Sequence, residues 1–134
     1  MLEMSFLDRF EPQLRSILRI VTAFTLSLHG WQKFFGVLGG IGGGRADLST
    51  PLGIAGVIET FGGALLFIGL FTRPVAFLVS GELAVGYFMA HAKNSIWPLL
   101  NGGELAVLYC FLYLWMSSKG AGPWSVDALI GRKH

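Results

Sequence analysis

Several polar and ionisable residues occur inside the most apolar stretches of this chain, where such side chains are most often functional. The candidates for ligand binding or proton transfer are His29, Gln32, Lys33, Glu59, His91 and Glu104. Histidine exchanges protons near neutral pH, and ionisable groups within apolar spans tend to face a protein interior or a water-filled path. We therefore expect these residues to form one polar site.

The spacing of these residues supports a shared location in the outer half of a helical bundle. Gln32 and Lys33 follow His29 by three and four residues, which places all three on one face of a helix. Asn101 precedes Glu104 by three residues. With a rise of about 1.5 Å per residue, Glu59 lies about 10 Å below the outer end of its helix. Each apolar stretch thus brings polar groups to a similar depth.

Arg19 and Glu82 predict a second polar layer nearer the inner side. On the same rise per residue, Arg19 lies about 6 Å and Glu82 about 12 Å above the inner boundary. Glu82 and His91 are nine residues apart, on opposite faces of one helix. We therefore expect Glu82 to pair with Arg19 rather than to join the outer site.

A structural role is the alternative for the same side chains. Lys33 and Arg19 can extend towards the two membrane surfaces, and Glu59 and Glu82 can hold helices together when paired or protonated. The single cysteine, Cys110, excludes an intrachain disulfide and a thiolate metal cage. The sequence assigns no catalytic residue and no metal ligand.

Four apolar segments, each near the length of about 20 residues that crosses a bilayer, position these residues. The expected spans are about 16–38, 52–71, 74–92 and 101–118 within a single domain, 1–134. A glycine-rich loop, a tight turn at Thr72-Arg73-Pro74 and a break near Trp97-Pro98 separate them. The predicted fold class is all-α, a transmembrane four-helix bundle.

Composition favours a membrane protein over a soluble bundle. Charged residues make up 13% of the chain and hydrophobic residues 53%, whereas an ordinary soluble domain has about 25% charged residues. Soluble bundle helices need a charged outer face, and segments 52–71 and 101–118 carry only Glu59 and Glu104. The net charge of +2 is too small to indicate nucleic-acid binding.

The distribution of lysine and arginine predicts the orientation, because these residues are enriched on the cytoplasmic side. With both termini inside, seven basic residues lie in the cytoplasm and three outside. The inner set is Arg9, Arg15, Arg19, Arg73, Lys119, Arg132 and Lys133, and the outer set is Lys33, Arg45 and Lys93. We therefore expect cytoplasmic N and C termini.

Short motifs recur in a characteristic order along the chain. They are His29–Lys33, Gly56–Gly63, Gly69–Arg73, Ala90-His91, Asn101–Glu104 and Gly120–Asp127. In this order and spacing, the chain resembles the DoxX family of small bacterial four-span membrane proteins, from about Arg15 to Asp127. The resemblance implies a multi-pass protein of the bacterial inner membrane.

The resemblance also implies a link to redox chemistry. The family name derives from a subunit associated with a membrane quinone-linked oxidoreductase acting on thiosulfate. Other members are linked to oxidative-stress complexes with superoxide dismutase and a sulfurtransferase. The implied cofactor is a quinone. The implied partners are the lipid bilayer, a soluble or membrane redox enzyme, and a second copy of the chain.

Three functional hypotheses follow from the sequence. The first is a redox-associated subunit that binds a quinone or a small sulfur or redox species; if the chain is an enzyme, it acts as a subunit of a quinone-linked oxidoreductase. The second is a non-catalytic membrane subunit that assembles or anchors a soluble redox enzyme. The third is a small transporter or channel, although the inverted repeat and broken helices of common transporters are missing.

Overall fold

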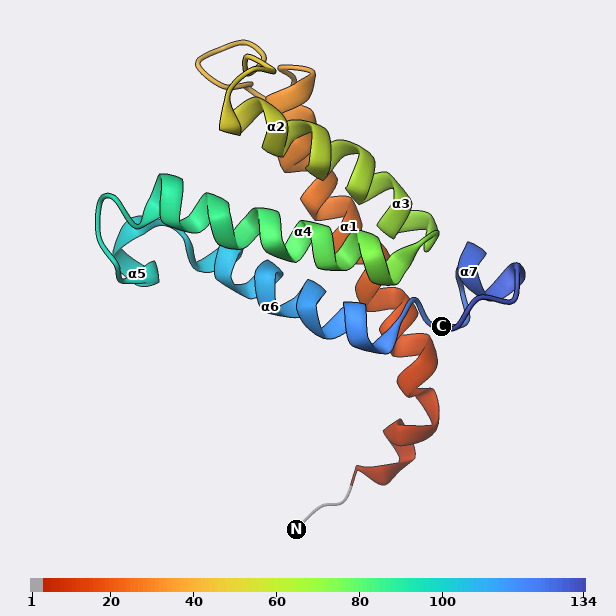
Figure 1. Ribbon diagram of the computed structural model, residues 1–134. Coiled ribbons are helices and arrows are strands. Elements are labelled where there is room, and N and C mark those ends of the chain that lie inside the picture. Colours follow the sequence, from red (N-terminus) through yellow and green to blue (C-terminus); the bar gives the residue numbers. More distant parts are fainter. Residues whose placement is uncertain (1–3) are drawn as a thin grey trace.

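The computed structural model describes residues 4–134, which form helices joined by loops and turns (Figure 1). Residues 1–3 of the predicted domain lie outside the described residues. The elements are a 3-10 helix η1 (Ser5–Phe10), α1 (Glu11–Phe34), α2 (Pro51–Val57), a π-helical turn η2 (Ile58–Gly62), α3 (Gly63–Ile68), α4 (Thr72–Gly86), a π-helical turn η3 (Tyr87–His91), α5 (Pro98–Asn101), α6 (Glu104–Lys119) and α7 (Val126–Leu129). The all-α fold class is confirmed.

Backbone turns set the helix ends and correct several predicted boundaries. The first helix ends at Phe34 rather than at 38, shortly before Gly36, whose φ of 72° lies in the left-handed region. The segment α2–η2–α3 stops before Gly69, whose φ is 73°. Asn101 does not open the last long helix. It ends the separate α5, and Gly102 then turns the chain with a φ of 73°.

Two of the predicted spans meet the length and hydropathy expected of a membrane-crossing helix. They are Pro51–Ile68, of 18 residues, and Thr72–His91, of 20 residues, with mean hydropathies of 1.7 and 1.2 over an 18-residue window. Within the described residues the other two do not. Helix α1 carries several charged side chains, and α6 has 16 residues, fewer than the roughly 20 that cross a hydrocarbon core.

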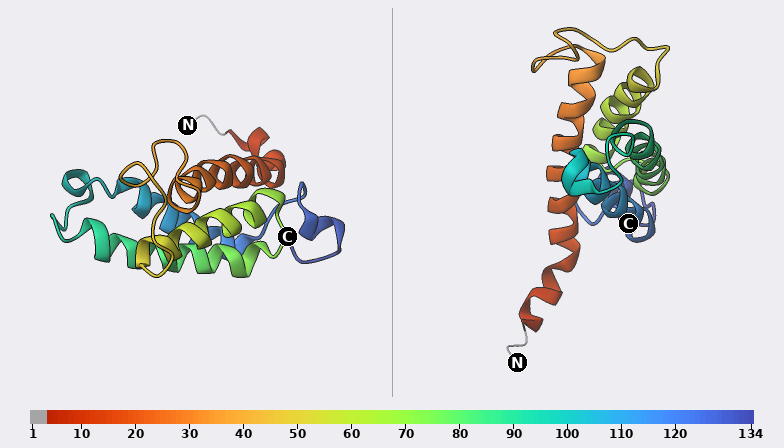
Figure 2. Two further views of the ribbon diagram at one scale, coloured as in Figure 1. Left: turned by 90° about the horizontal axis from the view of Figure 1, so that it is seen from above. Right: turned by 90° about the vertical axis from the view of Figure 1, so that its left-hand side faces the viewer.

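The core lies where α1 crosses the α4–α6 pair. Helices α4 and α6 run side by side, and α1 passes obliquely across them and extends beyond the rest of the molecule at its N-terminal end (Figures 1 and 2). Helix α1 also packs along α2, η2 and α3. The buried apolar residues are Ala23, Leu26, Leu66, Ala76, Val79, Leu83, Tyr109, Tyr113 and Met116.

The outward faces of α4 and α6 are as apolar as their buried faces. Phe77 of α4 is 65% exposed and Phe88 of the following turn η3 is 64% exposed, and Leu108 and Phe111 of α6 are 66% and 65% exposed. Contiguous exposed apolar surface of this kind marks contact with lipid or another protein. Water alone would be a poor solvent for this face.

Two glycines allow α1 to approach the second helical segment closely. A Cβ atom at Gly30 would lie 2.5 Å from the backbone nitrogen of Thr60, and one at Gly56 would lie 2.8 Å from the Cβ of Lys33. Small residues permit such backbone contact between helices. This contact places Lys33 beside the π-helical turn that contains Glu59.

Candidate functional site

A buried ion pair joins α1 to the second helical segment. The Nζ atom of Lys33 lies 2.5 Å from Oε2 of Glu59, and the Glu59 side chain is only 4% exposed. The expected contact between Glu59 and Lys33 is therefore present. Glu59 stands in η2, and π-helical turns are often found at functional sites.

Glu82 of α4 joins this pair, contrary to the sequence expectation. Its carboxyl group interacts electrostatically with both Glu59 and Lys33. Its Oε2 atom is buried and has no hydrogen-bond partner within residues 4–134. The expectation failed because η2, which carries Glu59, packs against α4, and depth along each helix does not show which helix faces meet.

Arg19 is engaged elsewhere, so the predicted inner layer of Arg19 with Glu82 is wrong. Its guanidinium donates from Nε to the carbonyl of Leu66 at 2.9 Å, from Nη2 to that of Trp124 at 2.6 Å, and from Nη1 to that of Ala121. The residue is 1% exposed. Helix ends leave carbonyls without partners, and Arg19 satisfies those of α3 and of the C-terminal segment.

Asp127 completes this inner network and was missed as a site residue. Its carboxylate accepts the backbone N–H groups of Phe71 and Thr72, each at 2.9 Å, and so caps the start of α4. The backbone N–H of Asp127 in turn donates to the carbonyl of Gly69 at 2.9 Å. The only sequence signal was its place in the last of the ordered motifs.

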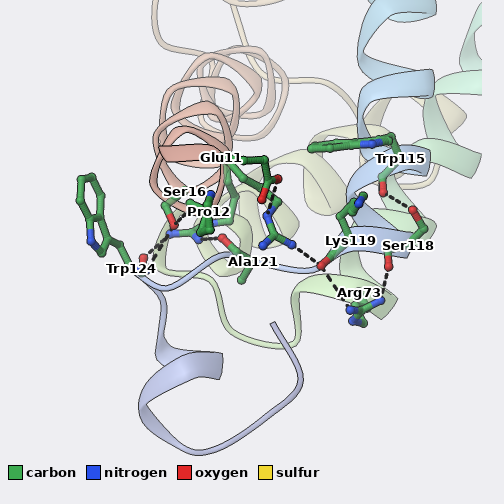
Figure 3. A network of polar contacts seen from close by, with 11 residues as sticks. Glu11, Pro12, Ser16, Arg73, Trp115, Ser118, Lys119, Ala121 and Trp124 are labelled. Carbon is green, nitrogen blue, oxygen red and sulfur yellow. Dashed lines mark hydrogen bonds and ion pairs between the residues drawn. The ribbon is translucent and has the colours of Figure 1, made fainter. Parts of the chain in front are cut away.

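Further contacts fasten the C-terminal segment to α1 and the start of α4 to the end of α6. Figure 3 shows Ser16 of α1 beside Trp124, and Arg73 against the end of α6 at Ser118 and Lys119. Ser16 Oγ accepts the N–H of Trp124 at 3.2 Å. Arg73 donates to the carbonyls of Ser118 and Lys119, the latter at 3.2 Å. We call the residues Arg19, Arg73, Asp127 and their backbone partners the inner lock.

His91 and Asn101 form a separate outer network rather than part of one site. His91 Nδ1 lies 3.1 Å from the carbonyl oxygen of Asn101. The Asn101 amide donates to the hydroxyl of Tyr87 at 2.9 Å and accepts from the N–H of Gly103 at 2.7 Å. These bonds hold the α5 turn between η3 and α6, a structural role that explains both residues.

A groove of about 470 Å³ runs between α1 and the start of α6 and contains two of the predicted residues. It is lined by Thr25, Leu28, His29, Gln32, Leu38, Leu105 and Tyr109. The side-chain amide of Gln32 donates to the carbonyl of Leu38 at 3.1 Å. The hydroxyls of Thr25 and Tyr109 are hydrogen-bonded to each other across the groove. Thr25 and Tyr109 were not predicted, because serine, threonine and tyrosine hydroxyls in apolar helices are usually structural.

The predicted single site is therefore divided. Lys33, Glu59 and Glu82 form a buried acid–base cluster, and His29 and Gln32 line the groove, while His91 belongs to the α5 turn. Glu104 is exposed at the first position of α6. Within residues 4–134, no group of three or more His, Cys, Asp or Glu side chains is arranged to hold a metal ion.

The outer loop adds one perturbed carboxylate. Asp47 accepts the backbone N–H of Ser49 at 2.9 Å and its hydroxyl at 2.8 Å. These hydrogen bonds to the ionised form lower the pKa of Asp47 below its ordinary value. Through its backbone carbonyl, Asp47 also accepts from Thr50, the residue that caps α2.

Fold and sites together define a small all-helical protein with an apolar exterior and polar groups held between its helices. The family model for DoxX matches residues 14–92. An uncharacterized protein of Haemophilus influenzae (strain ATCC 51907 / DSM 11121 / KW20 / Rd) is 42% identical over 128 residues, covering 92% of this chain and 96% of the relative. The chain belongs to the DoxX family. No solved structure matches it.

Proposed function

We propose that this protein is a multi-pass inner-membrane protein that binds a quinone in the groove between α1 and α6, as a subunit associated with redox enzymes. The observation that carries the proposal is the groove itself. It combines hydrogen-bonding groups at His29, Gln32 and Tyr109 with apolar walls on an otherwise lipophilic surface. Ligand pockets typically have this composition of apolar lining and a few placed polar groups.

The groove chemistry suits a ring with carbonyl groups and an apolar tail. A quinone carbonyl accepts hydrogen bonds, and the histidine ring and the primary amide of glutamine both donate them. One amide hydrogen of Gln32 serves Leu38, which leaves the second for a ligand. Leu28, Leu38 and Leu105 supply apolar contact for a ring. An isoprenoid tail would remain in the surrounding lipid.

The membrane placement follows from the apolar exterior and the basic residues. Exposed aromatic and aliphatic side chains on α4 and α6 fit a lipid solvent. In the proposed orientation, loop 39–51 faces the periplasm and residues 119–134 face the cytoplasm. In a Cys110→Ala background, a Ser49→Cys variant should react with an impermeant thiol reagent in cells with a permeabilised outer membrane. Labelling of Ser118→Cys but not of Ser49→Cys would contradict this orientation and support the opposite one.

Quinone binding is tested on the gently extracted full chain. Native mass spectrometry should show a retained quinone, and titration with a short-chain ubiquinone analogue should quench the intrinsic tryptophan fluorescence of the chain, which has four tryptophans. His29→Ala and Gln32→Ala should each raise the dissociation constant of the analogue by about 10-fold. This is the effect expected from losing one hydrogen bond of about 1.4 kcal/mol in a ligand site.

His134→Ala is the matched control, because His134 lies exposed at the opposite end of the chain and should leave the titration unchanged. If no quinone is retained and His29→Ala binds the analogue as tightly as the parent, the groove is not a quinone site. Stable co-purification of a soluble redox enzyme without quinone would instead support an anchoring subunit.

A further inference from the structure

We propose that Lys33, Glu59 and Glu82 form a proton-binding site inside the bundle, in which Glu82 carries one exchangeable proton beside the Lys33–Glu59 ion pair. This site is distinct from the groove and does not depend on quinone binding. Its ligand is a proton, taken up and released by one carboxyl group.

The argument begins with the charges that the fold brings together. Lys33 and Glu59 already neutralise each other at 2.5 Å. An ionised Glu82 would add an uncompensated negative charge at the same place. A lone charge among apolar side chains costs several kcal/mol, and such groups neutralise instead. Protonation of one carboxyl leaves the cluster with no net charge.

The orphan oxygen of Glu82 points to the position of that proton. Oε2 of Glu82 is buried and receives no hydrogen bond within residues 4–134. An ionised carboxylate oxygen without a donor bears the full cost of desolvation. A protonated carboxyl turns this oxygen into a donor, and the neighbouring Glu59 carboxylate is the acceptor within reach. Two carboxyl groups that share a site commonly hold one proton between them.

Among residues 4–134, the charged groups that act on Glu82 are Glu59 and Lys33. Lys33 comes from α1 and Glu59 from η2. Helix α6 has charged residues only at its two ends, Glu104 and Lys119. The titratable residues between them are Tyr109, Cys110 and Tyr113. The Cys110 carbonyl accepts the hydroxyl of Ser80 at 2.7 Å, which fastens α6 to α4 beside the site. The protonation of Glu82 therefore depends on two partners, both of which can be changed separately.

Of the Lys33–Glu59 pair, the lysine is the more exposed member. The Lys33 side chain is 17% exposed, whereas that of Glu59 is 4% exposed. The carbonyl of Lys33 accepts the N–H of Ala46, so the residue lies under the outer loop. The fold thus leaves the cluster closed among its helices and partly open at its lysine.

The experiment is a pH titration of the full chain in lipid nanodiscs, followed by infrared spectroscopy of the C=O stretch of protonated carboxyl groups. The parent should show this band at pH 7 and lose it as the pH rises, and the band should shift in deuterated water. Glu82→Gln should remove it. Glu59→Gln should also remove the band at pH 7, because Glu82 then loses its proton and becomes the ion-pair partner of Lys33.

Lys33→Gln should change the band in the opposite sense. Without the cation, both carboxyl groups hold protons more strongly, so the band should grow and persist to higher pH. Glu104→Gln is the control for an exposed carboxyl group and should leave the band unchanged. The absence of the band from the parent at pH 7 overturns the proposal without any variant, and so does a band that survives in folded Glu82→Gln.

Discussion

The inner lock and the acid–base cluster are both buried and polar, but they differ in how their hydrogen-bonding capacity is used. In the inner lock, Arg19 directs three donor groups at three carbonyls, and Asp127 accepts two backbone N–H groups. In the cluster, Glu82 keeps a buried oxygen that has no donor among residues 4–134. Within residues 4–134, Arg73 of the lock also keeps one buried nitrogen, Nε, without a partner, but this nitrogen belongs to a guanidinium that cannot take up a proton, whereas the Glu82 carboxyl can. We therefore assign stability to the lock and chemistry to the cluster.

The largest expected effect in this comparison comes from the lock. Arg19→Met removes the side-chain donor of the Ala121 and Trp124 carbonyls and leaves the Leu66 carbonyl with only the N–H of Gly69, and each unsatisfied buried group costs about 1–3 kcal/mol. We expect a loss of about 3 kcal/mol or more in the free energy of unfolding, measured by denaturant titration in detergent. Arg9→Met is the control, because the Arg9 side chain is exposed and lies over the ring of Phe10. An equal loss from both variants would contradict the role of Arg19.

Asp127→Asn should have the next largest effect. The amide can accept through one oxygen only, so one of the two N–H groups at Phe71 and Thr72 loses its partner, and the charge at the helix start is lost. Loss of a helix cap costs about 0.5–2 kcal/mol. Thermal unfolding at matched protein concentration measures this loss of stability. Asp8→Asn is the control, because Asp8 is exposed. Comparable stability of the Asp127 and Asp8 variants would count against the cap.

Gly30→Ala tests how the cluster is positioned. The added methyl group meets the backbone of Thr60 at 2.5 Å, and overpacking costs about 1–3 kcal/mol. We also expect the protonated carboxyl band of the parent to grow and to persist to higher pH, as in Lys33→Gln, because the displaced α1 moves the Lys33 cation away from Glu59. Gly81→Ala is the matched control in α4, since nothing lies within 4 Å of its added methyl group. If Gly30→Ala keeps the band and the stability of the parent, close helix contact is not what builds the cluster.

The smallest effect is expected at the exposed outer loop. Ser49→Ala removes a hydroxyl that donates to Asp47, so the pKa of Asp47 should rise towards its ordinary value. Because the folded pKa is lowered, the stability linked to Asp47 is present above its unfolded pKa and is lost as the pH falls through the folded value. Nuclear magnetic resonance titration of the Asp47 carboxyl carbon measures the change. An unchanged Asp47 titration in Ser49→Ala would assign the shift to the backbone N–H alone.

Sequence periodicity and composition determined the helical class and the approximate place of each long helix. They also placed Lys33 and Glu59 together, because both residues interrupt apolar segments at a similar depth. Helix ends were less predictable. The boundaries at Gly36, Gly69 and Gly102 depend on positive φ angles, which glycine permits but does not require. A glycine-rich chain offers many such positions, and sequence alone does not select among them.

Tertiary structure alone decided which polar residues meet. Depth along straight helices suggested Arg19 as the partner of Glu82, but depth says nothing about the direction in which a helix crosses its neighbours. Helix α1 runs obliquely across its neighbours (Figure 1). On this path Lys33 reaches Glu59 of η2, and Arg19 reaches the end of α3 and the C-terminal segment. Asp127 is buried for the same reason, because its capping partners lie 55 and 56 residues away in the chain. Long-range contacts of this kind arise from packing, which no local pattern encodes.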